Sequence, residues 1–199
     1  MAFVQQSSPH AHNARPTSRV MLWVIIAALP GLLAQTLFFG WGNLINVIWC
    51  IAVALASEAA ILALRNKPVA FFLKDNTAAV TGLLLGLSLP QFLPLWVSAI
   101  AVISAIVVAK QLYGGLGSNP FNPAMVGYVV VLISFPLEMT RWNPPLALAD
   151  MSMDLLEAFR YSLTGVLPAR MDLDMISLAT PLDVMRTKLD MGSDLSSIM

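Results

Sequence analysis

Long apolar runs separated by short polar connections dominate the first two thirds of the chain. A helix needs about 20 apolar residues to cross the hydrocarbon core of a membrane. Three runs come close to that length and predict membrane-spanning helices: Val20–Phe39, Leu44–Leu64 and Leu93–Ala109. Pro30 and Gly31 lie in the middle of the first run and predict a kink there.

Two shorter apolar runs, Thr77–Leu89 and Ala124–Phe135, predict short or broken helices. Both contain glycine, and both are followed by a proline. At 1.5 Å per residue each would be roughly 20 Å long, which is less than the thickness of the hydrocarbon core. Either they gain length from flanking residues, or they are half-helices that meet unwound backbone lining a cavity. The expected fold is an all-α integral membrane protein of about five transmembrane helices, forming the first half of a longer inverted-repeat bundle.

The composition and the placement of charge support this class. Hydrophobic residues make up 58% of the chain and charged residues only 11%, whereas soluble domains contain about 25% charged residues. Nine of the eleven acidic residues follow Pro136. The sequence therefore predicts a membrane region at 20–137, between an amino-terminal tail (1–19) and a polar segment (138–199). The sequence lacks the stripe of basic residues that is typical of nucleic-acid-binding proteins, so we expect no nucleic-acid partner.

The basic residues predict the orientation of the chain. If the amino terminus is cytoplasmic, all lysines and arginines up to residue 137 lie on the inner side: Arg15, Arg19, Arg65, Lys67, Lys74 and Lys110. The two outer loops then contain none, which is the positive-inside pattern. We therefore expect a multi-pass protein of a bacterial inner membrane, with residues after 137 in the periplasm. The final residues show no domain ending, and we expect the chain to be truncated at its carboxyl terminus.

Glu58 is the notable charged residue inside a predicted span. An ionisable group at such a depth is costly and is a functional candidate by default. Because Glu58 lies within about two helical turns of the end of its run, three roles stay open. It takes part in ion or proton transport, it snorkels to the interface, or it bonds to a neighbouring helix. Cys50, in the same run, is expected to be a small buried hydrophobe.

The polar segment contains one predicted helix, Met153–Leu163. Four apolar residues of this stretch recur at helical spacing and would lie along one side: Leu155, Leu156, Phe159 and Leu163. Such spacing is typical of an amphipathic helix. Several prolines interrupt the rest of the segment.

A glycine-rich motif, Tyr113–Ala124, follows the third long run and reads Tyr-Gly-Gly-Leu-Gly-Ser-Asn-Pro-Phe-Asn-Pro-Ala. Its glycines permit positive φ and close backbone approach, and its two Asn-Pro steps favour turns. Asn122 and Pro123 suit the cap and the first residue of the next helix, whose free N–H groups could hold an anionic ligand. An ordinary connection between spans is the alternative. Asn-Pro-Ala also occurs in aquaporins, in two copies, whereas this chain has one.

A second motif, Asp174–Asp183, lies in the polar segment. Pro181 disfavours helical geometry for Thr180, so the hydroxyl is expected on extended, accessible backbone. Such a hydroxyl can be esterified, for instance through a phosphate. Asp174 and Ser177 could then bind the metal or the substrate of a modifying enzyme. A plain periplasmic loop is the alternative.

Both motifs resemble those of one known family. Gly114–Tyr128 is similar to the signature of the family that contains the D subunit of the Rnf electron-transport complex and the B subunit of the sodium-pumping NADH:quinone reductase. Members carry FMN joined by a phosphoester bond to a threonine, in an Asp-x-x-Ser/Thr-x-Ala-Thr motif. The chain matches that motif at Asp174, Ser177, Ala179 and Thr180. Leu178 stands where many members have glycine. The resemblance covers essentially the whole chain.

The resemblance implies a membrane subunit of a ferredoxin:NAD oxidoreductase complex that couples electron transfer to Na⁺ or H⁺ movement. Covalent FMN would be attached to Thr180, and a second, non-covalent flavin such as riboflavin is a further candidate cofactor. Four residues are candidates for a flavin or ion environment: Gly115, Gly117, Asn119 and Asn122. We expect neither a catalytic residue nor a metal site in this chain.

The implied partners are the other Rnf subunits, especially the FMN-bearing G subunit and the membrane A and E subunits. A flavin transferase and the lipid membrane complete the set. The main alternative is a channel or permease of urea-channel-like architecture without a redox cofactor, since interrupted helices near the midplane build many transporter sites. A third class is a structural membrane subunit without a cofactor. It would be favoured if Thr180 proved to be unmodified and could be replaced without loss of function.

Overall fold

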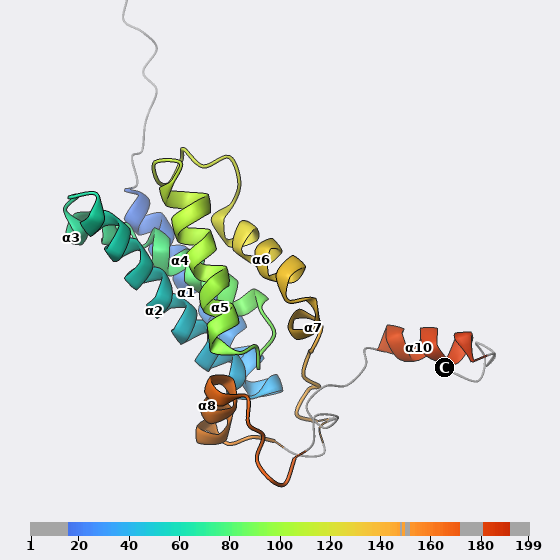
Figure 1. The fold of residues 1–199 in the computed structure, drawn as a ribbon. Helices are drawn as coiled ribbons and strands as arrows, with labels where there is room; N and C mark the ends of the chain where they lie inside the picture. Colours follow the sequence, from blue (N-terminus) through green and yellow to red (C-terminus); the bar gives the residue numbers. More distant parts are fainter. Residues whose placement is uncertain (1–15, 148, 150–151, 172–180, 192–199) are drawn as a thin grey trace, which may run out of the picture.

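The chain is an all-helical membrane protein (Figure 1). The computed structural model describes residues 16–147, 149, 152–171 and 181–191. Within these ranges two helices are long and apolar enough to cross a membrane, namely α1 (Thr17–Phe39) and α2 (Gly42–Leu64). The shorter apolar helices are α4 (Thr77–Ser88), α5 (Leu95–Ile103) with its continuation η1 (Ser104–Gln111), and α6 (Pro123–Ser134). The other helices of the described ranges are α3 (Val69–Leu73), α7 (Pro136–Met139), α8 (Leu155–Thr164) and α10 (Pro181–Asp190).

Each of the five predicted spans corresponds to one of these apolar helices, with ends shifted by a few residues. Helix α1 runs without interruption through Pro30. The two short runs, now α4 and α6, are short, continuous helices of 12 residues each. At about 1.5 Å per residue they measure roughly 18 Å. They therefore cover only part of the hydrocarbon core.

Helix α4 lies in the middle of the bundle, in contact with α1, α2, α5 and α6. Two glycines on α4, one turn apart, allow the backbone of α2 to approach closely. A Cβ on Gly82 would be 2.7 Å from the carbonyl oxygen of Cys50, and one on Gly86 would be 2.6 Å from the Cα of Val47. Glycines spaced by four residues are a common contact surface between membrane helices. The glycines that mark this run in the sequence are thus packing positions.

The main hydrophobic core lies between α2, α4, α5, η1 and α6. Cys50 and Ala101 are fully buried there, as predicted for Cys50. Helix α1 contributes little to this core, because most of its large apolar side chains are exposed and only Leu32 is buried. In a membrane protein such a surface faces lipid or another membrane segment.

The bundle has two distinct ends (Figure 1). The α3 end carries α3, the start of α1 and the glycine-rich loop, whose residues meet around one cavity. The α8 end carries α8 and the loop between α4 and α5, joined by the edge-to-face contact of Phe92 with Tyr161 at 5.5 Å.

Helix α8 begins at Leu155, two residues after the predicted start. The reason is a capping box, in which Asp154 precedes the helix and Glu157 accepts a hydrogen bond from the Asp154 N–H at 3.1 Å. The helix ends at Gly165, which adopts a φ of 71°. The amphipathic character predicted for this stretch is present in the structure.

Candidate functional site

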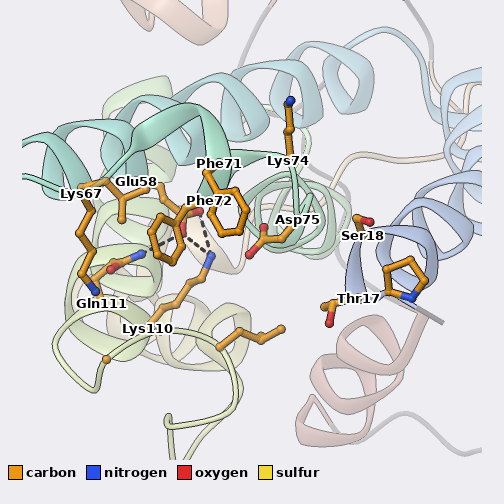
Figure 2. A pocket seen from close by; sticks show the side chains of 15 residues that line it. Thr17, Ser18, Glu58, Lys67, Phe71, Phe72, Lys74, Asp75, Lys110 and Gln111 are labelled. Carbon is orange, nitrogen blue, oxygen red and sulfur yellow. Dashed lines mark hydrogen bonds and ion pairs between the residues drawn. The ribbon is translucent and has the colours of Figure 1, made fainter. Parts of the chain in front are cut away.

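A cavity of about 580 Å³ opens at the α3 end of the bundle (Figure 2). Its lining comes from five parts of the chain: the start of α1, α2, the α3 region, η1 and the glycine-rich loop. Its aromatic side chains are Phe71 and Phe72, and the Lys67 ammonium lies 5.4 Å from the centre of the Phe72 ring. Lys74 points away from the centre of the cavity in Figure 2. The buried part of the cavity is charged.

Glu58 and Lys110 form a buried ion pair at this cavity. The Lys110 ammonium donates to Glu58 Oε1 at 2.6 Å and to Oε2 at 2.8 Å, and both residues are 2% exposed. Gln111 Nε2 donates to Glu58 Oε1 at 2.8 Å. Of the three roles left open for Glu58, the structure therefore shows the bond to a neighbouring helix and not the snorkelling side chain.

The pair continues into a hydrogen-bonded chain. The third proton of the Lys110 ammonium goes to Thr77 Oγ1 at 2.6 Å, and the Thr77 hydroxyl donates to Asp75 Oδ1 at 2.6 Å. Asp75 is half-buried, whereas Glu58 is buried. The row of hydrogen bonds therefore joins a partly accessible carboxylate to a buried one. An ammonium group has three donors, and all three are used here. The same Asp75 oxygen accepts from the Thr77 N–H at 2.8 Å and so caps the start of α4.

The geometry of η1 places two consecutive residues, Lys110 and Gln111, against the same carboxylate. This segment is a π-helix, closed by the Leu112 N–H bonding to the carbonyl of Val107 at 3.0 Å. Wide turns of this kind are frequent at functional sites. Arg65 Nη1 also donates to the carbonyl of Gln111 at 3.1 Å, which holds the end of η1 close to the end of α2.

Chemically, the cluster offers two carboxylates, one ammonium group and one hydroxyl in a continuous hydrogen-bonded row. A buried charge is stable only when it is paired and hydrogen-bonded. The two buried charges, Glu58 and Lys110, meet this requirement through each other, and Thr77 links them to the half-buried Asp75. A row of this kind can hand a proton along itself or exchange a cation with the cavity. Among the described residues, no group of three or more His, Cys, Asp or Glu side chains could hold a metal ion.

The four candidate residues of the glycine-rich loop lie in separate places. Gly115 lines the cavity with Glu58 and Lys110. Gly117 and Asn119 lie in the exposed part of the loop, where the Gly117 N–H donates to Asn119 Oδ1 at 3.1 Å. Asn122 caps α6, since its Oδ1 accepts from the Ala124 N–H at 3.0 Å. The predicted cap is thus confirmed, whereas a role in holding flavin or an ion stays a prediction.

The glycines of this loop serve backbone conformation. Gly114, Gly115 and Gly117 have φ values of 102°, 108° and 91°, which side chains of L-residues rarely adopt. A Cβ on Gly115 or Gly117 would meet no atom within 4 Å. Close approach of other described atoms is therefore not the reason for glycine at these two positions.

The candidate attachment residues Asp174, Ser177, Ala179 and Thr180 lie outside the described residues. The nearest described positions are Met171, which is buried beside Met153 and Ala158, and Pro181, the first residue of α10. These two positions mark where the motif-bearing segment leaves and re-enters the described part of the chain.

Sequence reasoning missed the partners of Glu58. The position of Lys110 at the end of an apolar run suggests a flanking residue, but its side chain is buried. The signal that could have found it is physical: two opposite charges inside apolar runs of one membrane region should pair, because leaving both unpaired is expensive. Thr77 and Gln111 give no comparable signal, since uncharged polar residues are common near the ends of spans.

Comparisons with known proteins point in one direction. The profile of the family described as "NQR2, RnfD, RnfE family" matches residues 4–199. A Marinobacter nauticus protein, named as the D subunit of an ion-translocating oxidoreductase complex, is 70% identical over 190 residues, which cover 95% of this chain and 53% of the relative. Proteins of the same name from Citrobacter koseri and Escherichia fergusonii are 50% and 48% identical over 206 residues, covering this whole chain and 59% and 58% of their own lengths. The chain thus spans a little over half the length of these relatives.

Proposed function

Because the chain belongs to the NQR2, RnfD, RnfE family, we propose that it is part of a membrane subunit of an ion-translocating ferredoxin:NAD oxidoreductase complex. Its proposed task is to carry electrons on covalently bound FMN, as one step in a larger assembly. Its relatives are named as the D subunit of an ion-translocating oxidoreductase complex. That name supports both the membership of a complex and the translocation of an ion by that complex. The proposal concerns the complete protein, since this chain spans only a little over half the length of those relatives.

The observation that carries the flavin proposal is the match of Asp174, Ser177, Ala179 and Thr180 to the attachment motif. Helix α10 begins at Pro181, directly after Thr180 in the sequence. The N–H groups in the first turn of a helix have no partner within it and favour anions. A phosphoester on Thr180 would therefore have a favourable neighbour in the chain. FMN supplies electron-transfer chemistry when bound, and the protein residues hold and place it.

The basic residues support an orientation for this assembly. Arg65, Lys67 and Lys74 gather at the α3 end, which we therefore place in the cytoplasm of a cell with an inner membrane. The α8 end and the attachment motif would then lie in the periplasm, where the flavin transferase of this family acts. The proposed electron donor is the flavin of the G subunit, and the A and E subunits are the proposed membrane neighbours.

The cluster of Glu58, Lys110, Thr77 and Asp75 supports the ion-coupling part of the proposal. Charged groups inside the membrane are expensive to keep, even when paired, and typically mark an ion or proton route. The cluster meets a cavity at the α3 end, so it is accessible from the proposed cytoplasmic side. Whether the coupled ion is a proton or a sodium ion is for experiment to decide.

The covalent flavin is tested by replacing Thr180 in the full-length protein, expressed with its flavin transferase. Denaturing electrophoresis of the wild-type protein is expected to show a band with flavin fluorescence. The Thr180→Val variant, which lacks the hydroxyl, is expected to show none. Mass spectrometry should find the mass of FMN less one water on the peptide that contains Thr180.

A dark wild-type band with an unmodified peptide, in the presence of a working transferase, would contradict the flavin proposal. It would favour a channel or permease, for which the Asp174–Thr180 motif has no use. A known flavinylated protein expressed with the same transferase serves as the positive control for the transferase itself.

The proposed role of the glycine-rich loop is tested with two asparagine variants in the complete complex. Asn119→Ala removes the side chain that organises the exposed loop, and Asn122→Ala removes the cap of α6, which should cost about 1 kcal/mol of helix stability. If the loop borders a flavin or an ion route, both variants should slow electron transfer or ion uptake at normal complex assembly. Unchanged rates of both processes in both variants would rule that role out.

A further inference from the structure

Helix α8 presents three different faces. Successive residues on a helix are about 100° apart, so Ala158 and Ser162 share one face, which is buried against the bundle. Arg160 and Thr164 share another, which is exposed and polar. Between these two lies an exposed apolar face made of Leu155, Leu156, Phe159 and Leu163.

The apolar face of α8 is too exposed for a helix surrounded by water. Its four side chains are between 46% and 59% exposed, although they are among the largest apolar residues of the helix. Exposed apolar patches of this kind mark a contact with a membrane or with another molecule. The buried face is already satisfied by the bundle, through a small core that contains Met153, Ala158 and Met171.

The apolar face is continuous with exposed apolar surface on α2 and α5. Phe159 lines a shallow groove of about 230 Å³ together with residues of those two helices, among them Ile48, Ala52 and Leu95. Ile48 is 59% exposed, and the neighbouring Trp96 of α5 is 55% exposed. The groove reaches Ala52, about ten residues into α2, or roughly 15 Å along that helix. Its lining is almost entirely apolar.

From this arrangement we propose that α8 is a membrane-interface helix, and that phospholipid acyl chains of the leaflet at the α8 end cover its apolar face. Each face of α8 then has a suitable environment. The buried face packs against the bundle, the apolar face contacts lipid, and the polar face contacts water and headgroups. This is the arrangement of a helix that lies in the plane of the interface. Arg160, beside the apolar face, can extend its guanidinium to headgroup phosphates while its stem stays among the acyl chains.

The anchoring has a consequence for the motif that follows. Met171 is buried with Ala158 in the core below α8, and Thr180 follows nine residues later. Nine residues span at most about 30 Å. The attachment residue therefore stays within about 30 Å of Met171, which the buried face of α8 holds in place. This consequence rests on the proposed function, whereas the lipid contact of α8 does not.

The contact is tested by nitroxide labelling of the full-length protein in vesicles of phosphatidylcholine and phosphatidylglycerol. Single cysteines replace residues 155, 156, 159, 160, 163 and 164 in turn, and Cys50 remains because it is fully buried. Unmutated full-length protein measures the background labelling of Cys50 and of any cysteine in the rest of the protein. Collision rates are then recorded with oxygen, which concentrates in hydrocarbon, and with a nickel chelate, which stays in water.

The expected result is a ratio of oxygen to nickel collisions several-fold higher at Phe159 and Leu163 than at Arg160 and Thr164. The matched control is built into the helix, because Phe159 and Arg160 are neighbours in sequence but lie on different faces. High nickel collision rates at Phe159 and Leu163 would show that water covers the face. Low rates with both reagents would show that protein covers it. Either result overturns the proposal and leaves the flavin test on Thr180 unaffected.

Discussion

Replacing Gly82 with alanine is expected to lower the stability of the full-length protein by about 3 kcal/mol, the upper end of the usual range for overpacking. The new Cβ would lie 2.7 Å from the carbonyl oxygen of Cys50 and 2.8 Å from the Cα of Ile51. Both are backbone atoms of α2, which cannot move aside as a flexible side chain can. Helix α4 cannot retreat either, because α1, α5 and α6 surround it. The measurement is the midpoint temperature for loss of the monodisperse protein in detergent.

Gly31→Ala is the matched control for this variant. Gly31 also lies inside an apolar helix, but a Cβ there would meet no atom within 4 Å. Since alanine is favoured over glycine in a helix by about 1 kcal/mol, this change is expected to leave the midpoint unchanged or to raise it. Equal midpoints for the two variants would show that the approach of α4 to α2 is looser than the structure has it.

The helices themselves could be predicted because each depends on local sequence. The length of an apolar run decides whether a helix can reach across a membrane, and all five runs form helices. Local caps are equally readable: Asn122 and Pro123 start α6 as their residue types predict. The start of α8 is displaced from its predicted position because Asp154 and Glu157 together form a cap that the apolar spacing alone does not reveal.

Contacts between helices could not be predicted, because they depend on the rotation and depth of each helix in the bundle. Glu58 and Lys110 are 52 residues apart in sequence. No local feature indicates that their side chains meet, and only the cost of two unpaired charges inside one membrane region favours the pair. Gly82 and Gly86 suggest a broken helix when the sequence is considered alone, since glycine is unfavourable inside one. Their role in packing becomes clear only in the structure, where the backbone of α2 lies directly against them.

The glycine-rich loop shows the same division between local and distant effects. Its residue types make it conspicuous in the sequence, and positive φ values at three of its glycines account for them. Only Gly115 of its four candidate residues lines the cavity. The charges of the cavity come instead from α2, from η1 and from the segments on either side of α3, which individually look like ordinary ends of apolar runs.

Replacing Lys110 with methionine is expected to destabilise the full-length protein by about 3–5 kcal/mol. The loss removes three hydrogen bonds at once and leaves the Glu58 carboxylate buried with Gln111 as its remaining partner. Glu58→Met should cost a similar amount, because it leaves the ammonium group with Thr77 alone. The double variant removes both charges, and apolar replacement of a complete buried pair is often close to neutral. The Gln111 amide then lacks its acceptor, so we expect a residual cost of about 1–2 kcal/mol.

The double variant separates the structural contribution of the pair from a role in ion movement. Midpoint temperatures of the wild type, the two single variants and the double variant give the coupling energy, and additive losses would contradict the pairing. Because the double variant is expected to fold and assemble, its ion uptake can be compared with its electron transfer in the complete complex. Electron transfer without ion uptake would place Glu58 and Lys110 on the ion route. Unchanged ion uptake would leave the pair a purely structural element, and the ion would have to cross the membrane elsewhere.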